Sequence, residues 1–173
     1  MADNYIQFSE QINDLTPEIA EWVKEVLLFD MTDCNVQDYD DARKALADKL
    51  SCSLDEVSGI EYWPHFDWEL EGADKNSLWL TDNGEGFDLE NLMLFVKYLI
   101  NKWMPDYIFS VTWAETCSKP RVGEFGGGWA VMTKDDCLMG NAHQAVKETV
   151  SHILKERSSN VNSNQIKLPL EAY

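Results

Sequence analysis

The stretch that decides the fold is HFDWELEGADKNSLWL, residues 65–80. Its first part alternates between aromatic or apolar side chains and acids, and this period of two is typical of a half-buried strand. Gly72–Ser77 predicts a turn, and Leu78-Trp79-Leu80 continues as the partner strand. We therefore expect an antiparallel hairpin whose first strand has two unlike faces: Asp67, Glu69 and Glu71 on one, and Phe66, Trp68 and Leu70 on the other.

Helices are predicted on both sides of this hairpin. Before it, Thr16-Pro17-Glu18 is a typical helix start, and apolar residues at helical spacing extend the helix to about Phe29. A second helix is expected over 40–50, followed by a short helical turn at 53–56. After the hairpin, Asp88 caps the clearest helix of the chain, which runs to Trp103 before Pro105.

The remaining segments repeat this pattern. Residues 107–113 and 129–133 predict two strands with a loop over 118–128 between them. Residues 5–12 show only a weak alternation, which predicts one short strand. Asn141 caps a last helix, for which we expect a buried apolar face made by Ala142, Ala145, Val146, Val150, Ile153 and Leu154. The segment 158–173 is rich in Ser and Asn and is expected to be a flexible tail.

The order of elements, α-α-ββα-ββα, indicates the fold class. Consecutive hairpins with helices between them favour an α+β fold, in which helices cover one face of an antiparallel sheet of four to five strands. At this length a single domain is expected, over residues 1–157.

The charge of the chain is divided unevenly along its length. The sequence has 31 acids against 14 bases, a net charge of -17. Residues 1–90 hold 23 of the acids and five of the bases, so 1–90 is a strongly acidic half and 91–157 a near-neutral one. Aromatic residues make up 12% of the chain, which speaks against an acidic disordered protein. Such a charge repels nucleic acid and attracts basic protein surfaces.

Several classes of protein are disfavoured by what the sequence lacks. It shows no signal peptide and no apolar run long enough to cross a membrane. Its four cysteines are far apart and form no CxxC pair, so we expect neither a structural zinc site nor any other metal site. No motif predicts a cofactor, and the excess of acids argues against direct nucleic-acid binding.

The most distinctive motif is TWAETCSKPRVGEFGGGWAV, residues 112–131. Its cations and glycines suggest an anion-binding loop made by Lys119, Arg121, Gly126, Gly127 and Gly128. The alternative is a hairpin loop whose glycines permit a bulge and close packing of backbones. A cysteine nucleophile at Cys117, with His143 or His152 as base and Glu115 orienting it, is a third and weaker interpretation.

This motif, with the preceding helix ENLMLFVKYLINKWMPD, resembles a family of small bacterial proteins often found on phages and integrative elements. The resemblance covers roughly residues 75–135. The family has no settled activity, so the resemblance assigns no catalytic residue. It implies a mobile-element protein in the cytoplasm of a bacterial host.

Together these features predict a non-enzymatic acidic interaction protein. Its partner would be the basic surface of a nucleic-acid-binding protein, for example a CRISPR effector or a restriction enzyme, which it would block as a DNA mimic. The acidic face is expected to comprise Asp38, Asp40, Asp41, Glu61, Asp67, Glu69, Glu71, Asp74, Asp82 and Glu85. Three alternatives stay open: an enzyme that binds a nucleotide or another anion at the glycine-rich loop, a homodimer with only a structural role, and acidity that serves solubility alone.

Overall fold

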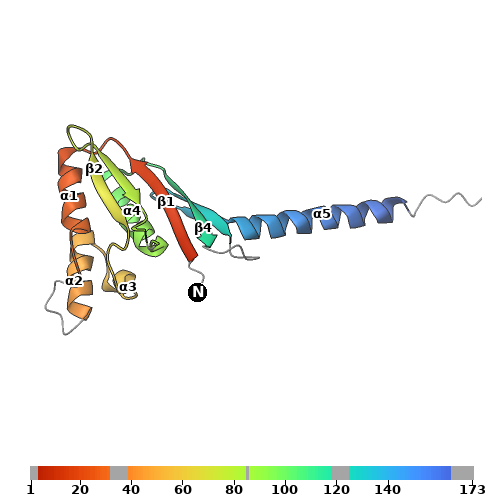
Figure 1. The fold of residues 1–173 in the computed structure, drawn as a ribbon, viewed down its shortest axis with the longest axis horizontal. Coiled ribbons are helices and arrows are strands. Elements are labelled where there is room, and N and C mark those ends of the chain that lie inside the picture. Colours follow the sequence, from red (N-terminus) through yellow and green to blue (C-terminus); the bar gives the residue numbers. More distant parts are fainter. Residues whose placement is uncertain (1–3, 32–38, 85, 118–124, 165–173) are drawn as a thin grey trace, which may run out of the picture.

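The strand that the sequence marks most weakly lies in the middle of the sheet. A computed structural model describes residues 4–31, 39–84, 86–117 and 125–164 (Figure 1). In it, β1 (Asn4–Ile12) pairs with β3 on one side and with β4 on the other, so that it joins two hairpins into one sheet.

The sheet has six antiparallel strands in the order β2-β3-β1-β4-β5-β6. The other five are β2 (Asp67–Glu71), β3 (Ser77–Thr81), β4 (Phe109–Cys117), β5 (Gly126–Met132) and β6 (Cys137–Asn141). The predicted α+β class with an antiparallel sheet is thus confirmed, with more strands than the four to five expected. The unexpected strand is β6, whose residues are exposed apart from half-buried Gly140 and therefore show no apolar alternation.

In the described part of the chain, five helices accompany the sheet: α1 (Pro17–Leu27), α2 (Tyr39–Leu50), α3 (Leu54–Val57), α4 (Leu89–Trp103) and α5 (Ala142–Asn164). The predicted caps are confirmed. The Thr16 hydroxyl accepts a hydrogen bond from the Ile19 amide at 3.3 Å. The Asp88 carboxylate accepts hydrogen bonds from the amides of Glu90 and Asn91. These bonds satisfy amides that a helix N-terminus otherwise leaves without a partner.

One face of the sheet lies against the helices and the other lies in solvent. On the covered face Ile12, Leu78 and Phe109 are at most 2% exposed, and they join residues of α1, α2 and α4 in one hydrophobic core. Alternate positions on the same strands, such as Gln11, Trp79 and Ser110, are exposed. The uncovered face of the sheet is therefore open to solvent.

The segment that leads into β2 is held by the N-terminus of α4. The buried side chain of Asn91 donates hydrogen bonds to the carbonyl oxygens of Tyr62, at 2.7 Å, and Pro64, at 3.3 Å. The amide of Asp88 donates to the carbonyl of His65 at 3.2 Å. Because buried amides must find partners, these bonds fix where β2 begins.

Helix α5 departs from the prediction. Figure 1 shows it leaving the end of the sheet and projecting away from the body. Every one of its residues from 142 to 155 is exposed, so the expectation of a buried apolar face is wrong. The helix also continues to Asn164, although a tail was expected from residue 158. Its apolar spacing was visible in the sequence, but the spacing does not say what covers the apolar side.

Candidate partner-binding surface

Three carboxylates form a row on the uncovered face of the sheet. Asp67, Glu69 and Glu71 are exposed on β2, while Trp68 and Leu70 between them are half-buried and pack against the core. This confirms the alternation read from the sequence. Successive residues of a strand advance by ~3.4 Å, so the row extends over roughly 14 Å from its first acid to its last. Because β2 is at the edge of the sheet, a partner can approach the row from the face and from the side.

The neighbouring strands add one aromatic ring and several polar groups. Trp79 on β3 lies opposite Glu69 and is 36% exposed. Its indole nitrogen donates a hydrogen bond to the Ser9 hydroxyl at 2.8 Å, which holds the ring in place on the face. Gln11 donates to a carboxylate oxygen of Glu71 at 3.1 Å. Trp63 and Phe66, in the same region, are buried in the core, whereas Trp79 is exposed.

An open hollow of about 750 Å³ lies at the end of this row. Its walls include three carboxylates, the Trp79 ring and the turn after β3: Pro64, Phe66, Asp67, Trp68, Glu69, Trp79, Thr81, Asp82, Asn83 and Gly84. Asp82 is partly engaged by the backbone, since it accepts hydrogen bonds from the amides of Phe8 and Gly84. Carboxylates beside an exposed aromatic ring favour the binding of a cation. A guanidinium group suits such a place best, because it can form hydrogen bonds with the carboxylates and stack on the ring.

Among the residues that the structure describes, the row has no cation of its own. The ion pairs found among the described residues join Lys24 to Glu21, Arg43 to Asp40, Lys49 to Glu25 and Lys97 to Glu56. In that part of the chain no lysine or arginine pairs with Asp67, Glu69 or Glu71. A charged partner would therefore not have to displace an internal cation.

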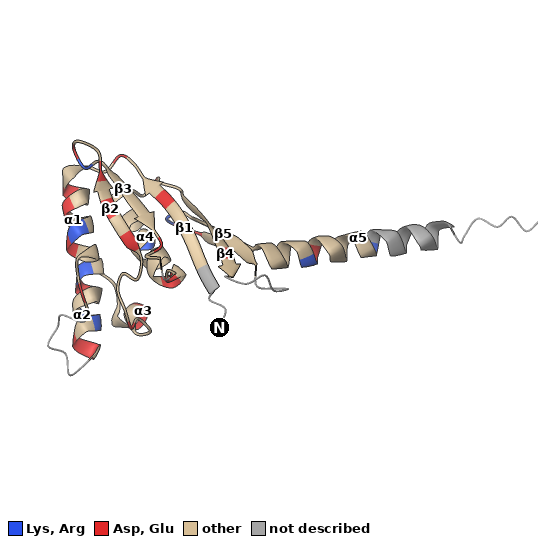
Figure 2. Cartoon of the chain, in the orientation of Figure 1, with Lys and Arg blue, Asp and Glu red and all other residues tan. Residues whose placement is uncertain are grey.

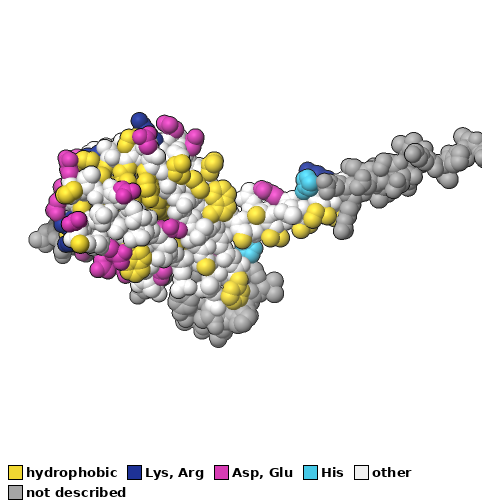
Figure 3. Space-filling view, turned by 90° about the horizontal axis from the view of Figure 1, so that it is seen from above, with side chains coloured by type: hydrophobic (Ala, Val, Ile, Leu, Met, Phe, Trp, Pro, Cys, Tyr) yellow, Lys and Arg dark blue, Asp and Glu magenta, His cyan; other side chains and the backbone are white. Residues whose placement is uncertain are grey.

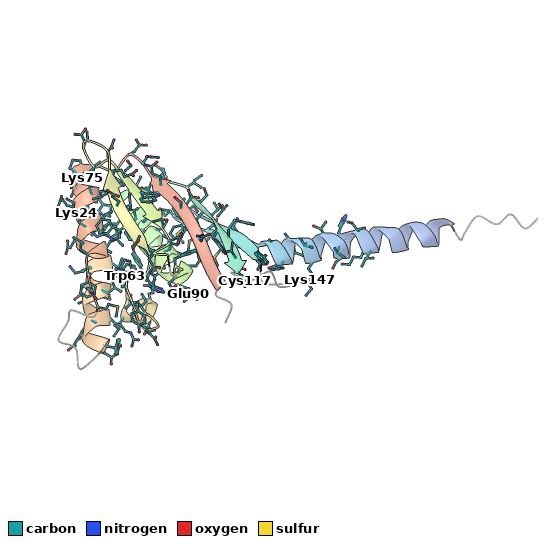
Figure 4. All side chains as sticks on the ribbon, in the orientation of Figure 1. Lys24, Trp63, Lys75, Glu90, Cys117 and Lys147 are labelled. Carbon is teal, nitrogen blue, oxygen red and sulfur yellow. The ribbon has the colours of Figure 1, made fainter. Side chains whose placement is uncertain are left out.

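The other acids predicted for this face are scattered. Asp74 is exposed in the turn at the end of β2, next to Lys75 (Figure 4). Asp40 and Asp41 lie in the first turn of α2, which Figure 2 shows apart from the β2 row. Glu61 is exposed in the segment before β2. Asp38 and Glu85 lie outside the described residues. The sequence thus named the acids of the row correctly but could not separate them from acids on other elements.

The glycines of the distinctive motif lie in a strand rather than in a loop. Gly126, Gly127 and Gly128 open β5, where they pair with β4. A methyl group on Gly128 would lie 2.3 Å from Cζ2 of Trp113, and one on Gly127 would lie 2.3 Å from the Trp113 carbonyl oxygen. Close packing therefore accounts for these glycines. Lys119 and Arg121 lie outside the described residues, so the anion-binding loop stays a prediction.

The residues of the suggested cysteine site gather only in part. A methyl group on Gly126 would lie 2.8 Å from a carboxylate oxygen of Glu115 and 3.0 Å from Nε2 of His143. Cys117 is buried two residues beyond Glu115, at the end of β4 near the root of α5 (Figure 4). His152 lies nine residues farther along α5, roughly 13 Å from His143 at the rise of a helix. His152 is therefore poorly placed to serve as the base.

A second group of titratable side chains lies where α3 meets α4. Lys97 donates to Glu56 at 2.7 Å, and this bond, with further bonds from Tyr98 and Ser53, lowers the pKa of Glu56 from 4.5 to about 2. Burial raises the pKa of the Cys52 thiol, and the neighbouring Glu56 carboxylate raises it further. A thiol held in its neutral form is a poor nucleophile. We therefore assign this group to the stability of the fold.

No cluster of His, Cys, Asp and Glu suited to a metal ion occurs in the described residues. Within the same residues, none of the helices has both the length and the apolar composition needed to cross a membrane. Comparison of the chain with protein-family models, with curated proteins and with solved structures gives no match.

Proposed function

We propose that this chain is a non-enzymatic acidic interaction protein that binds the basic surface of a nucleic-acid-binding protein. The observation that carries the proposal is the row of Asp67, Glu69 and Glu71, three exposed carboxylates on an edge strand with no ion pair among the described residues. A groove that evolved to hold phosphates would supply the cations that the row lacks.

The spacing of the row suits a surface that normally receives a nucleic acid. Alternate residues on a strand lie ~6.8 Å apart, and the phosphates of one DNA strand advance by ~3.4 Å per nucleotide along the axis and lie farther apart through space. Charges of one sign at comparable intervals can meet the same lysines and arginines. The hollow beside Trp79 adds a place for an arginine side chain, whose planar guanidinium stacks on aromatic rings.

The class of partner follows from the context of the sequence. The resemblance of residues 75–135 to proteins of phages and integrative elements favours a target in host defence, because such elements gain from blocking it. We therefore propose a CRISPR effector or a restriction enzyme as the partner, with the protein acting in the cytoplasm of the bacterial host.

The proposal can be tested by competition with DNA. The purified protein is added to a restriction enzyme or CRISPR effector bound to a fluorescently labelled DNA duplex, and release of the duplex is followed by anisotropy. We expect release by the wild type, and a loss of roughly 100-fold or more in potency for the variant with Asp67→Lys, Glu69→Lys and Glu71→Lys, because attraction becomes repulsion at each position.

A matched control separates the row from the net charge. Asp48→Lys, Asp106→Lys and Asp135→Lys change the charge by the same amount at exposed positions away from β2. This control should keep most of the potency, and the potency of the wild type should fall as salt is raised. Equal losses in the two triple variants would show that only bulk charge matters. Failure of the wild type to release DNA from members of either enzyme class would refute the proposal.

A further inference from the structure

Helix α5 is exposed on all sides over residues 142–155. Residues 142–155 are all exposed, and the contacts of the helix with the body are mainly to β5 and β6 at its root. It contains Val146, Thr149, Val150, Ser151 and Ile153, which are residue types with weak helix propensity. Because most helices in proteins owe their stability to packing, a projecting helix of this composition needs a surface to cover it.

The helix carries an apolar stripe to which such a surface can bind. Val146, Val150, Ile153 and Leu154 are 64%, 50%, 41% and 56% exposed. Their spacing of four, three and one residues puts them on one side of a helix. Figure 3 shows hydrophobic side chains along one side of α5, whereas acids gather on the body. The stripe therefore lies on a part of the surface that carries few acids.

We propose that the stripe is covered by α5 of a second copy of this chain, with the two helices antiparallel. The charge of the chain restricts where two copies can meet. A copy carries a net charge of -17, and its excess of acids lies in residues 1–90, so contact between two bodies is repulsive. The charged residues in the sequence of α5 are Lys147, Glu148, Lys155, Glu156 and Arg157, three bases against two acids, so the helix is the part of the molecule where two copies can meet without that repulsion.

The direction of pairing follows from the same repulsion. Parallel helices would bring the two acidic bodies side by side. Antiparallel helices paired about Val150 would place the two roots, at Ala142 of each copy, ~24 Å apart, which is about three times the Debye length of ~8 Å at physiological salt. A two-fold axis at Val150 then sets Val150 against its own copy and Val146 against Leu154 of the second copy. The stripe is thus complementary to itself.

The size of the contact sets the expected strength. Helices paired about Val150 overlap over a strip ~24 Å long and ~10 Å wide, which is smaller than the ~800 Å² that each partner of a standard interface buries. We therefore expect a reversible dimer whose fraction rises with protein concentration. Sedimentation velocity over a concentration series at physiological salt measures its dissociation constant.

Two variants with the same added charge test the stripe. Val150→Glu places two carboxylates opposite each other at the axis, and we expect it to raise the dissociation constant roughly tenfold or more. His152→Glu lies about 200° farther around the helix and should leave the dissociation constant within about threefold. The thermal unfolding of both variants, followed by near-ultraviolet circular dichroism, shows whether the body stays folded. A wild type that remains monomeric throughout the series, or equal effects of the two variants, would overturn the proposal.

Cysteine crosslinking tests the direction. In a background with Cys137→Ser, a mixture of Val146→Cys and Leu154→Cys proteins should form a mixed disulfide under mild oxidation, because these positions face each other only in the antiparallel pair. A disulfide between two Val146→Cys chains as the main product would instead show a parallel pair and contradict the proposal. The dimer uses no residue of β2, so these measurements stand whatever the competition with DNA shows.

Discussion

Among single residues, Glu56 gives the clearest prediction of pH dependence. Its carboxylate accepts hydrogen bonds from Lys97 at 2.7 Å and from the Ser53 hydroxyl at 3.0 Å, and its pKa falls from 4.5 to about 2 in the folded protein. A pKa that is lower in the folded state than in the unfolded state stabilises the fold above the unfolded value. This contribution is lost as the pH falls from about 4.5 to about 2.

We therefore expect Glu56→Gln to destabilise the protein at pH 7 and to have a much smaller effect at pH 2.5, where most of the contribution has been lost. The side chain is 34% exposed, so solvent screening reduces the expected loss to about 1 kcal/mol. Urea unfolding at the two pH values measures it, with Asp106→Asn as an exposed control. An equal loss at both pH values would mean that the ion pair is not its source.

The row of acids was predictable from the sequence, but the residues around it were not. The period of two in 65–71 marked Asp67, Glu69 and Glu71 as one face of a strand, and the structure places them so. Trp79 was harder to assign, because it lies between the buried residues Leu78 and Leu80. Nothing in the sequence shows that the face of the sheet to which Trp79 belongs is uncovered. Asp40 and Asp41 looked equivalent to the row because charge counts ignore which element carries each acid.

At the level of elements, the glycines of β5 predict a cost of substitution. A methyl group on Gly128 would lie 2.3 Å from Cζ2 of Trp113 and 2.7 Å from the carbonyl oxygen of Gly140. Both neighbours belong to strands paired with β5, so neither can move freely. We expect Gly128→Ala to lower the free energy of unfolding by about 1–3 kcal/mol.

Gly59→Ala is the matched control, since a methyl group there would meet nothing within 4 Å. Its effect should stay within about 0.5 kcal/mol in the same urea experiment. If the two alanine variants proved equally stable, close packing would no longer explain the glycines. An anion-binding role for this part of the motif would then be tested by a thermal-shift screen with nucleotides and phosphate.

The elements with strong local signals were the predictable ones. Helix α4 has a capping acid, a continuous apolar face and Pro105 after its end, and it was found almost where it was expected. The central strand β1 shows only a weak alternation in its sequence. Pairing with neighbours on both sides, rather than its own sequence pattern, fixes its place in the sheet. Strand β6 has an exposed surface and was missed for the same reason. Such strands depend on pairing that a single sequence does not display.

At the scale of the whole molecule, the structure separates two kinds of surface. Figures 2 and 3 show acids on the body and few on the projecting helix. The division of charge along the chain was visible in the sequence, because counting acids needs no structure. The sequence did not show that α5 points away from the body. An amphipathic helix has the same sequence pattern whether its apolar side packs against its own sheet or against another molecule. The two proposals therefore concern opposite ends of one molecule.

The two edges of the sheet differ in a way that bears on storage and handling. Edge strands template aggregation unless charges guard them, and β2 has three carboxylates where β6 has none and exposes Leu138 and Met139. Near the isoelectric point of about 4.3 the repulsion between molecules vanishes, and we expect precipitation to start at β6. Leu138→Lys should delay turbidity at that pH more than Ile108→Lys does, although Leu138 and Ile108 are almost equally exposed, at 63% and 64%. Equal delays would place the weak point elsewhere.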